Sequence, residues 1–180
     1  MDSDKQAITE VINLYQVALD TRSWDLFEDI FTADVISDYC HVLYWTDLAS
    51  FVAQFTEMHE ATAGHQHSLG VPHIVIEGDR AWALTYGRFN VFNKSPAESV
   101  FDMSHGGATY DDELIRTPKG WRICKRVARN FWWQGSQPQN GPYKQIVDHY
   151  PTMARNEEIN FLNAYRRVHG KPAPVREAAE

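Results

Sequence analysis

The segment "PHIVIEGDRAWALTYGRFNVF" (residues 72–92) contains two runs rich in β-branched and aromatic residues, separated by the pair Gly78-Asp79. Such runs favour β-strands, and a Gly-Asp pair supplies the backbone freedom that a tight turn needs. The segment "GGATYDDELIRTPKGWRICKRVARNFWW" (106–133) repeats the pattern, with "TPKG" (117–120) between its two runs. The sequence therefore predicts two long antiparallel hairpins within residues 66–134.

The residues before these hairpins favour helices. Apolar residues at positions 8, 11, 12, 15, 18 and 19 follow helical spacing, and Ser3 with Gln6 forms a capping-box pattern at the start of this first helix. The segment "DTRS" (20–23) indicates a break. After it, Ser23 is expected to cap a short second helix, which would carry on one face Trp24, Phe27 and Phe31.

A strand and a third helix are predicted next. The segment "DVISDYCHVLYW" (34–45) has the composition of a strand. The segment "TDLASFVAQFTEMH" (46–59) returns to helical spacing, with Thr46 or Asp47 as its N-cap and an end near His59.

Helices followed by antiparallel hairpins are typical of an α+β fold. We expect a cone-shaped, strongly curved antiparallel sheet with three N-terminal helices packed on it, which leaves a half-open cavity. Residues 1–134 would form this cone domain, and residues 135–180 a C-terminal extension. The extension is predicted to contain an amphipathic helix near 155–168 and a frayed tail, "KPAPVREAAE" (171–180).

Composition excludes several classes of function. The 180 residues carry a net charge of -7 and no run of basic residues, which argues against nucleic acid as a partner. No glycine-rich phosphate loop indicates a nucleotide or flavin site, and no apolar stretch is long enough for a membrane span. Lacking a secretory signal pattern, the chain is expected to be cytoplasmic, with Cys40 and Cys124 as small core residues.

Three of the eight histidines gather in a short segment, at positions 65 and 67 of "GHQHSLG" (64–70) and at position 73. An H-x-H pair on a strand points both imidazoles to one face, which suits a metal site. A cupin-type site would need a carboxylate four or five residues later, but Glu77 lies ten residues after His67. We therefore expect no metal and no other cofactor.

Three motifs resemble the SnoaL-like group of the nuclear transport factor two-like superfamily. They are "YQVALDTRSWDLFEDIFTADV" (15–35), "HSLGVPHIVIEGDRAWA" (67–83) and "GGATYDDELIRTPKGWRI" (106–123), and their order and spacing carry the resemblance over residues 5 to 130. Members of this group include scytalone dehydratase, bile-acid dehydratase, hexachlorocyclohexane dehydrochlorinase and polyketide cyclases. The fold alone does not choose among these activities.

The resemblance implies that His67 is a general base paired with Asp20 at the end of the first helix. The pairing is physically reasonable, because a carboxylate at a helix C-terminus faces the negative end of the helix dipole and is stabilised by an imidazolium. His65 remains an alternative base. The resemblance also places Tyr15 and Tyr39 where phenols point at a leaving group.

A second group of residues are candidate substrate contacts whose orientation stays open, because strand alternation puts some inside the cone and others outside. This second group comprises His65, Tyr44, Trp45, Phe89, His105, Asn130 and Trp132. Asp111 and Asp112 should fall on opposite faces of one strand, and a carboxylate in this region is the base in polyketide cyclases. A solvated, salt-bridged outer face is expected for Arg116, Arg122 and Arg126.

The resemblance, taken with these residues, thus implies a cofactor-independent lyase for a small aromatic or polycyclic substrate. Dehydration is the simplest reaction, and loss of formaldehyde from an aromatic diol is a close neighbour. The alternatives are an isomerase or cyclase of the same fold and a non-catalytic ligand-binding module. A homo-oligomer, either a trimer or a dimer, is expected because the outer face of such a sheet is apolar.

Overall fold

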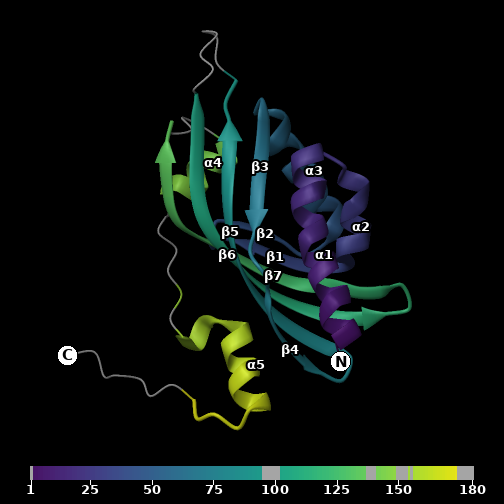
Figure 1. Cartoon of the computed structure of the whole chain (residues 1–180). Helices are drawn as coiled ribbons and strands as arrows, with labels where there is room; N and C mark the ends of the chain where they lie inside the picture. Colours follow the sequence, from purple (N-terminus) through teal and green to yellow (C-terminus); the bar gives the residue numbers. More distant parts are fainter. Residues whose placement is uncertain (1, 95–101, 137–140, 149–153, 155, 174–180) are drawn as a thin grey trace, which may run out of the picture.

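One curved, seven-stranded sheet forms the centre of the described part of the chain, with strand order β2-β1-β7-β6-β5-β3 and with β4 also paired to β5. The computed structural model describes residues 2–94, 102–136, 141–148, 154 and 156–173 (Figure 1). Along the chain the elements are α1 (Asp2–Thr21), the 3₁₀ turn η1 (Trp24–Leu26), α2 (Phe27–Ile30), β1 (Phe31–Tyr39), β2 (Leu43–Trp45), α3 (Leu48–Glu60), β3 (Gly64–Leu69), β4 (His73–Glu77), β5 (Arg80–Phe92), β6 (Met103–Thr117), β7 (Gly120–Gly135), α4 (Gly141–Asp148), the 3₁₀ turn η2 (Asn156–Glu158) and α5 (Asn160–Val168).

The predicted α+β class is confirmed, with one change in the sheet. The two hairpins β4-β5 and β6-β7 are antiparallel and turn at the expected positions, where Gly78 and Gly120 have positive φ. Strand β1, however, pairs with β7 in parallel. The sheet is therefore mixed: β1 lies between β2, with which it is antiparallel, and β7, with which it is parallel.

Several details of the helices differ from the sequence prediction. Helix α1 already begins at Asp2, so Ser3 lies inside it and does not cap it. The hydroxyl of Ser23 bonds to Thr21 and makes no cap contact, and Phe31 is the first residue of β1. The Asp47 cap of α3 is confirmed, since its carboxylate accepts a hydrogen bond from the Ser50 amide at 2.8 Å.

Helix α4 was not predicted, whereas α5 follows the predicted amphipathic segment. Most of the tail expected to fray, residues 174–180, lies outside the described residues. Cys40 is buried, Cys124 is half-buried, and no disulfide joins them. In the part of the chain that the structure describes, no helix is both long enough and apolar enough to cross a membrane.

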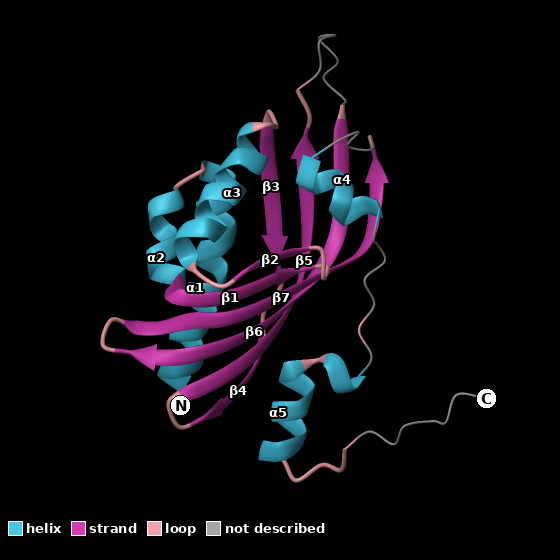
Figure 2. Cartoon of the chain, turned by 180° about the vertical axis from the view of Figure 1, so that it is seen from behind, coloured by secondary structure: helices cyan, strands magenta, loops and turns pink. Residues whose placement is uncertain are grey.

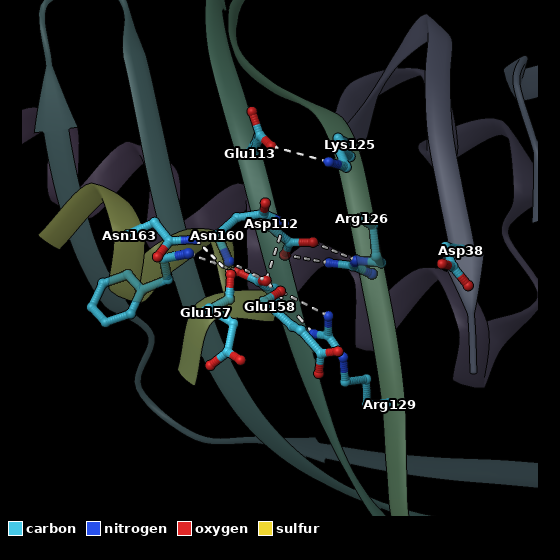
Figure 3. A network of polar contacts seen from close by, with 12 residues as sticks. Asp38, Asp112, Glu113, Lys125, Arg126, Arg129, Glu157, Glu158, Asn160 and Asn163 are labelled. Atoms are coloured by element: carbon cyan, nitrogen blue, oxygen red, sulfur yellow. Dashed lines mark hydrogen bonds and ion pairs between the residues drawn. The ribbon is translucent and has the colours of Figure 1, made fainter. Parts of the chain in front are cut away.

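A buried ion pair occupies the centre of the core. Arg126 on β7 and Asp112 on β6 are both fully buried, and their side chains form two hydrogen bonds of 2.7 and 2.8 Å (Figure 3). Burial acts to lower the pKa of Arg126, but the charge and the hydrogen bonds of the Asp112 carboxylate act in the opposite direction. The pKa of Arg126 is on balance raised well above its ordinary value, and the guanidinium stays charged. The guanidinium lies over the rings of Tyr15 and Tyr110 at 4.2 and 4.8 Å.

The solvated outer face predicted for three arginines is therefore wrong for two of them. Of the three, only Arg116 has an exposed side chain, which forms ion pairs with Asp4 and Asp79. Arg122 is mostly buried and binds Asp29 and the Glu28 carbonyl. The alternation of β7 turns Arg126 toward the helices, where Asp112 offsets the cost of burying its charge.

Helix α5 packs on the outer face of the sheet, beside β4 (Figures 1 and 2). Asp111 faces this helix, as expected for a residue next to Asp112 on one strand. Its buried carboxylate accepts hydrogen bonds from the backbone amides of Asn160 and Phe161 at 2.7 and 3.0 Å, so a sheet residue caps the helix. A small apolar cluster including Trp82 and Phe161 lies under α5. The homo-oligomer stays a prediction, and α5 occupies part of the face on which it would rest.

We expect Arg126→Met to destabilise the fold by about 3–5 kcal/mol, because it leaves the Asp112 carboxylate buried without a counter-charge. The double variant Arg126→Met with Asp112→Leu should recover most of this loss. Urea unfolding at neutral pH measures both effects. As a control, a variant that removes the exposed ion pair between Arg167 and Glu77 should lower the free energy of unfolding by less than about 1 kcal/mol. A double variant no more stable than Arg126→Met would contradict this account.

We expect Asp111→Ala to release α5 without unfolding the sheet. Amide hydrogen exchange across residues 160–168 should accelerate about tenfold, the effect of losing one helix cap. Exchange in β6 and β7 should change less, with the largest change there around Arg129, which loses its ionic partner 3.6 Å away. The control is Asp34→Ala, at an exposed position of β1. Equal acceleration in the helix and in the sheet would show that Asp111 supports the whole fold instead.

Candidate active site

The end of α1 fixes the position of Asp20. The Ser23 amide bonds to the Ala18 carbonyl and the Arg22 amide to the Leu19 carbonyl, while Arg22 has a φ of 55°. This is a Schellman-type end, which stops the helix and leaves the carboxylate in its last turn. The Arg22 side chain donates to the carbonyls of His59 and Thr62, which ties the end of α1 to the end of α3.

Strand β3 lies at the edge of the sheet, and α1 covers its open side. The outward-facing backbone amide of His67 donates to both carboxylate oxygens of Asp20, at 3.0 and 2.8 Å. The amide of Leu69 donates to the side chain of Gln16, one helical turn before Asp20, at 3.1 Å. These contacts satisfy edge amides that would otherwise lack partners, so the position of the carboxylate depends on the strand itself.

The same carboxylate also holds the imidazole of His67. Nδ1 of His67 lies 2.7 Å from Oδ1 of Asp20. The His67 side chain is 10% exposed and that of Asp20 25%. Because a carboxylate accepts hydrogen bonds, Nδ1 carries a proton, and in the neutral ring Nε2 holds the free lone pair. This is the tautomer that a general base needs.

Three tyrosines meet beside His67. The hydroxyls of Tyr15 and Tyr39 lie 2.7 Å apart, and the ring of Tyr15 makes an edge contact with the ring of Tyr110. Burial raises the pKa of all three phenols, while the charge of Arg126 acts in the opposite direction. These tyrosines therefore stay protonated and can serve as hydrogen-bond donors.

A cavity lies in the concave side of the sheet, with about 480 Å³ of space between its atoms when its open mouth is included. The walls combine aromatic and aliphatic side chains with a few polar groups. They are formed by Tyr15, Leu19, Tyr39, Phe55, Met58, His59, His65, His67, Phe89, Val91, Tyr110, Asn130, Trp133 and Ile146.

A β-bulge decides which tryptophan faces the cavity. The pairing of β6 with β7 shifts between Gly107 and Ala108, which skips one residue of β7 between Asn130 and Trp132. Asn130 and Trp133 consequently line the cavity, whereas Trp132 is on the outer face with its indole over Gly107. Strict alternation would have placed Asn130 and Trp132 on one face, and bulges of this kind are frequent beside active sites.

Three further residues expected at the site lie away from the cavity. Tyr44 on β2 is 62% exposed. Trp45 is a core residue, with its ring against Phe51 and its indole nitrogen bonded to Gln54. His105 packs against Trp132 on the other side of β6 and bonds to Gln134.

Sequence reasoning missed several residues of the cavity wall. Tyr110 precedes Asp112 by two positions on β6, so the same alternation that turns Asp112 inward could have identified it. His59 is the last residue of the apolar stripe of α3. The centroid of its ring lies 4.5 Å from that of the His65 ring. Ile146 comes from α4, whose docking no local pattern indicates.

Burial and neighbouring charge lower the pKa values of the two other cavity histidines. For His59 the chief cause is burial, followed by His65, and its pKa lies well below the usual value. For His65, burial and then the proximity of His67 bring the pKa to about 4. Both rings are therefore neutral at neutral pH. Among the described residues, no three His, Cys, Asp or Glu side chains are grouped so that they could hold a metal ion.

Comparisons with known proteins agree with this architecture. Residues 3–127 match the family model of the SnoaL-like domain. The uncharacterized protein Rv2910c of Mycobacterium tuberculosis is 31% identical over 132 residues, which cover 69% of this chain and 84% of that protein.

Solved structures show the same fold at low sequence identity. The Kfla4162 protein of Kribbella flavida superposes with a TM-score of 0.69 at 19% identity, covering 81% of this chain and 98% of that one. A Novosphingobium aromaticivorans protein provisionally assigned as a scytalone dehydratase superposes with a TM-score of 0.65 at 13% identity, covering 76% of this chain and 89% of that one. The chain thus belongs to the SnoaL-like domain family.

Proposed function

We propose that the protein is a cofactor-independent lyase that removes water or a small fragment from a small aromatic or polycyclic substrate. The observation that carries this proposal is the Asp20–His67 pair. The carboxylate holds the base in the required tautomer, and the imidazole lies in the wall of a cavity. A module that only binds a ligand has no need for a charged residue fixed to a histidine at that position.

In the proposed dehydration, Nε2 of His67 takes a proton from the substrate carbon next to the one bearing the hydroxyl group. The electron pair of the broken C–H bond forms the double bond, and the C–O bond breaks. Asp20 stabilises the imidazolium, which then gives its proton to the departing hydroxide, so that water leaves and His67 is neutral again.

The tyrosines would assist the departure of the oxygen. Tyr15 and Tyr39 share one hydrogen bond, and both remain protonated because burial raises their pKa values. A phenol of this pair can donate to the oxygen on which negative charge develops.

The carboxylates of β6 do not fit the role of the base, which disfavours the cyclase alternative. Asp112 is bound on both oxygens by Arg126 beneath the tyrosines. Asp111 is on the opposite face, where it caps α5.

The aromatic walls favour a flat apolar substrate. Phe55, Phe89 and Trp133 present their rings to the cavity. The provisional dehydratase assignment of the Novosphingobium structure is compatible with this substrate class, although at 13% identity the likeness concerns the fold alone.

We expect His67→Ala to lower turnover by about 10²–10⁴-fold, the usual contribution of a general base. Asp20→Asn should cause a similar loss, because the amide of Asn would donate to Nδ1 and move the ring proton to Nε2. The double variant should fall little further, since the two residues act as one unit. The assay incubates the protein with aromatic alcohols and diols and detects by mass spectrometry the loss of water or formaldehyde.

A second histidine–aspartate pair provides the matched control. His41 and Asp38 lie 2.8 Å apart outside the cavity, with the His41 side chain 60% exposed. His41→Ala and Asp38→Asn should leave turnover within about twofold of the wild type. Near-normal turnover of His67→Ala would overturn the proposed base.

We expect Tyr15→Phe and Tyr39→Phe to lower kcat by about tenfold each, less than His67→Ala, because one phenol of the pair donates to the leaving oxygen, the other holds it in place, and both changes spare proton abstraction. The loss should appear in kcat more than in KM, since charge on the leaving oxygen develops only in the transition state. A change confined to KM would mean that the tyrosines bind the substrate without assisting the reaction.

A further inference from the structure

His65 is held in one tautomer by a short hydrogen-bonded chain. The hydroxyl of Thr62 donates its proton to the carbonyl of His59 at 2.8 Å, and the same oxygen lies 2.7 Å from Nε2 of His65. A hydroxyl has one proton to give, so in the second bond Thr62 accepts and Nε2 of His65 donates. Nδ1 of His65 is then the nitrogen without a proton.

This second nitrogen is a buried acceptor without a partner. His65 is 8% exposed, it lines the cavity, and Nδ1 makes no hydrogen bond to any of the described residues. Buried polar atoms are nearly always paired in folded proteins, so an unpaired acceptor in a cavity wall indicates a missing hydrogen-bond donor. Burial of the ring, and next the proximity of His67, oppose protonation of His65 by lowering its pKa, which keeps this nitrogen an acceptor.

The geometry points to a ligand hydroxyl as that donor: we propose that the cavity takes a hydroxylated aromatic molecule, such as a phenol, whose O–H donates to Nδ1 of His65. Phe89 and Trp133, packed against each other, form part of the apolar wall for the ring system. A ketone, an ether or a methyl group at the same position would leave the nitrogen unpaired, so the site selects a hydroxyl.

This role differs from that of His67. Asp20 stabilises the protonated form of His67, whereas a hydroxyl and a backbone carbonyl, both uncharged, are the groups at the end of the His65 chain. His65 therefore recognises a substrate group, and His67 moves the proton. The inference rests on the proposal that the cavity binds an aromatic molecule and is independent of the elimination step.

The test compares two ligands of nearly equal shape, 2-naphthol and 2-methylnaphthalene, by equilibrium dialysis. The measured quantity is the ratio of their Kd values in each protein, so that differences in ligand hydrophobicity cancel between variants. His65→Gln places its amide nitrogen near the position of Nε2 and offers no acceptor at the position of Nδ1. His65→Asn places its carbonyl oxygen near Nδ1 and keeps that acceptor.

We expect His65→Gln to lower the preference for 2-naphthol about tenfold, which corresponds to about 1.4 kcal/mol, and His65→Asn to keep it within about twofold of the wild type. An unchanged preference in His65→Gln, an equal loss in both variants, or no binding of 2-naphthol by the wild type would each overturn the proposal. Because no turnover is measured, these outcomes are separate from those of the His67 and Asp20 variants.

Long-range ¹H–¹⁵N NMR of the wild-type protein gives a second readout that needs no substitution. The free protein should show His65 with a proton on Nε2 and none on Nδ1, and 2-naphthol should shift the Nδ1 resonance in the direction of a new hydrogen bond. A proton on Nδ1, or an Nδ1 resonance that 2-naphthol does not move, would contradict the proposed contact.

Discussion

A single positive charge in the apolar core constrains the arrangement around it. Arg126 is fully buried, and its only ionic partner among the described residues is Asp112 on the neighbouring strand. An isolated guanidinium at this depth would be strongly unfavourable, so strands β6 and β7 must pair in the register that brings the two side chains together. The rings of Tyr15 and Tyr110 lie against the guanidinium, which fixes the floor of the cavity. The ion pair thereby contributes to the specificity of the fold as well as to the polarity of the site.

The position of the Asp20–His67 pair depends on a second constraint, the unpaired edge of β3. An exposed strand edge needs partners for its amide groups, and α1 provides them through side chains one helical turn apart. The carboxylate that binds the backbone of His67 is the one that binds its ring. Movement of the strand relative to the helix would break both contacts at once, so the distance between Asp20 and Nδ1 varies little as long as the sheet is intact. One carboxylate, that of Asp20, therefore both supports the strand and orients the His67 ring.

The sequence was informative where local chemistry decides structure. Turn residues located both hairpins, and Asp47 marked the start of α3 because its cap contact is local. The pairing of Asp20 with His67 was anticipated from the family resemblance and from the helix dipole, although 47 positions separate them. Features that depend on distant contacts were not anticipated. The bulge that exchanges Trp132 for Trp133 arises from pairing between strands, and the burial of Arg126 becomes favourable only with Asp112 beside it. The parallel pairing of β1 with β7 and the docking of α4 likewise have no signal in their own segments.

The cavity wall is assembled from residues far apart in the order of synthesis. Tyr15 is among the first of them to be made, whereas Ile146 of α4 is the last and comes after the whole sheet. During translation the sheet can form while its concave side still lacks Ile146, a buried member of the core cluster. Exposed apolar surface of this kind promotes aggregation of folding intermediates. The segment that completes the cavity wall therefore also ends the period in which the nascent chain is vulnerable, so truncation before α4 would reduce the yield of folded protein as well as alter the cavity.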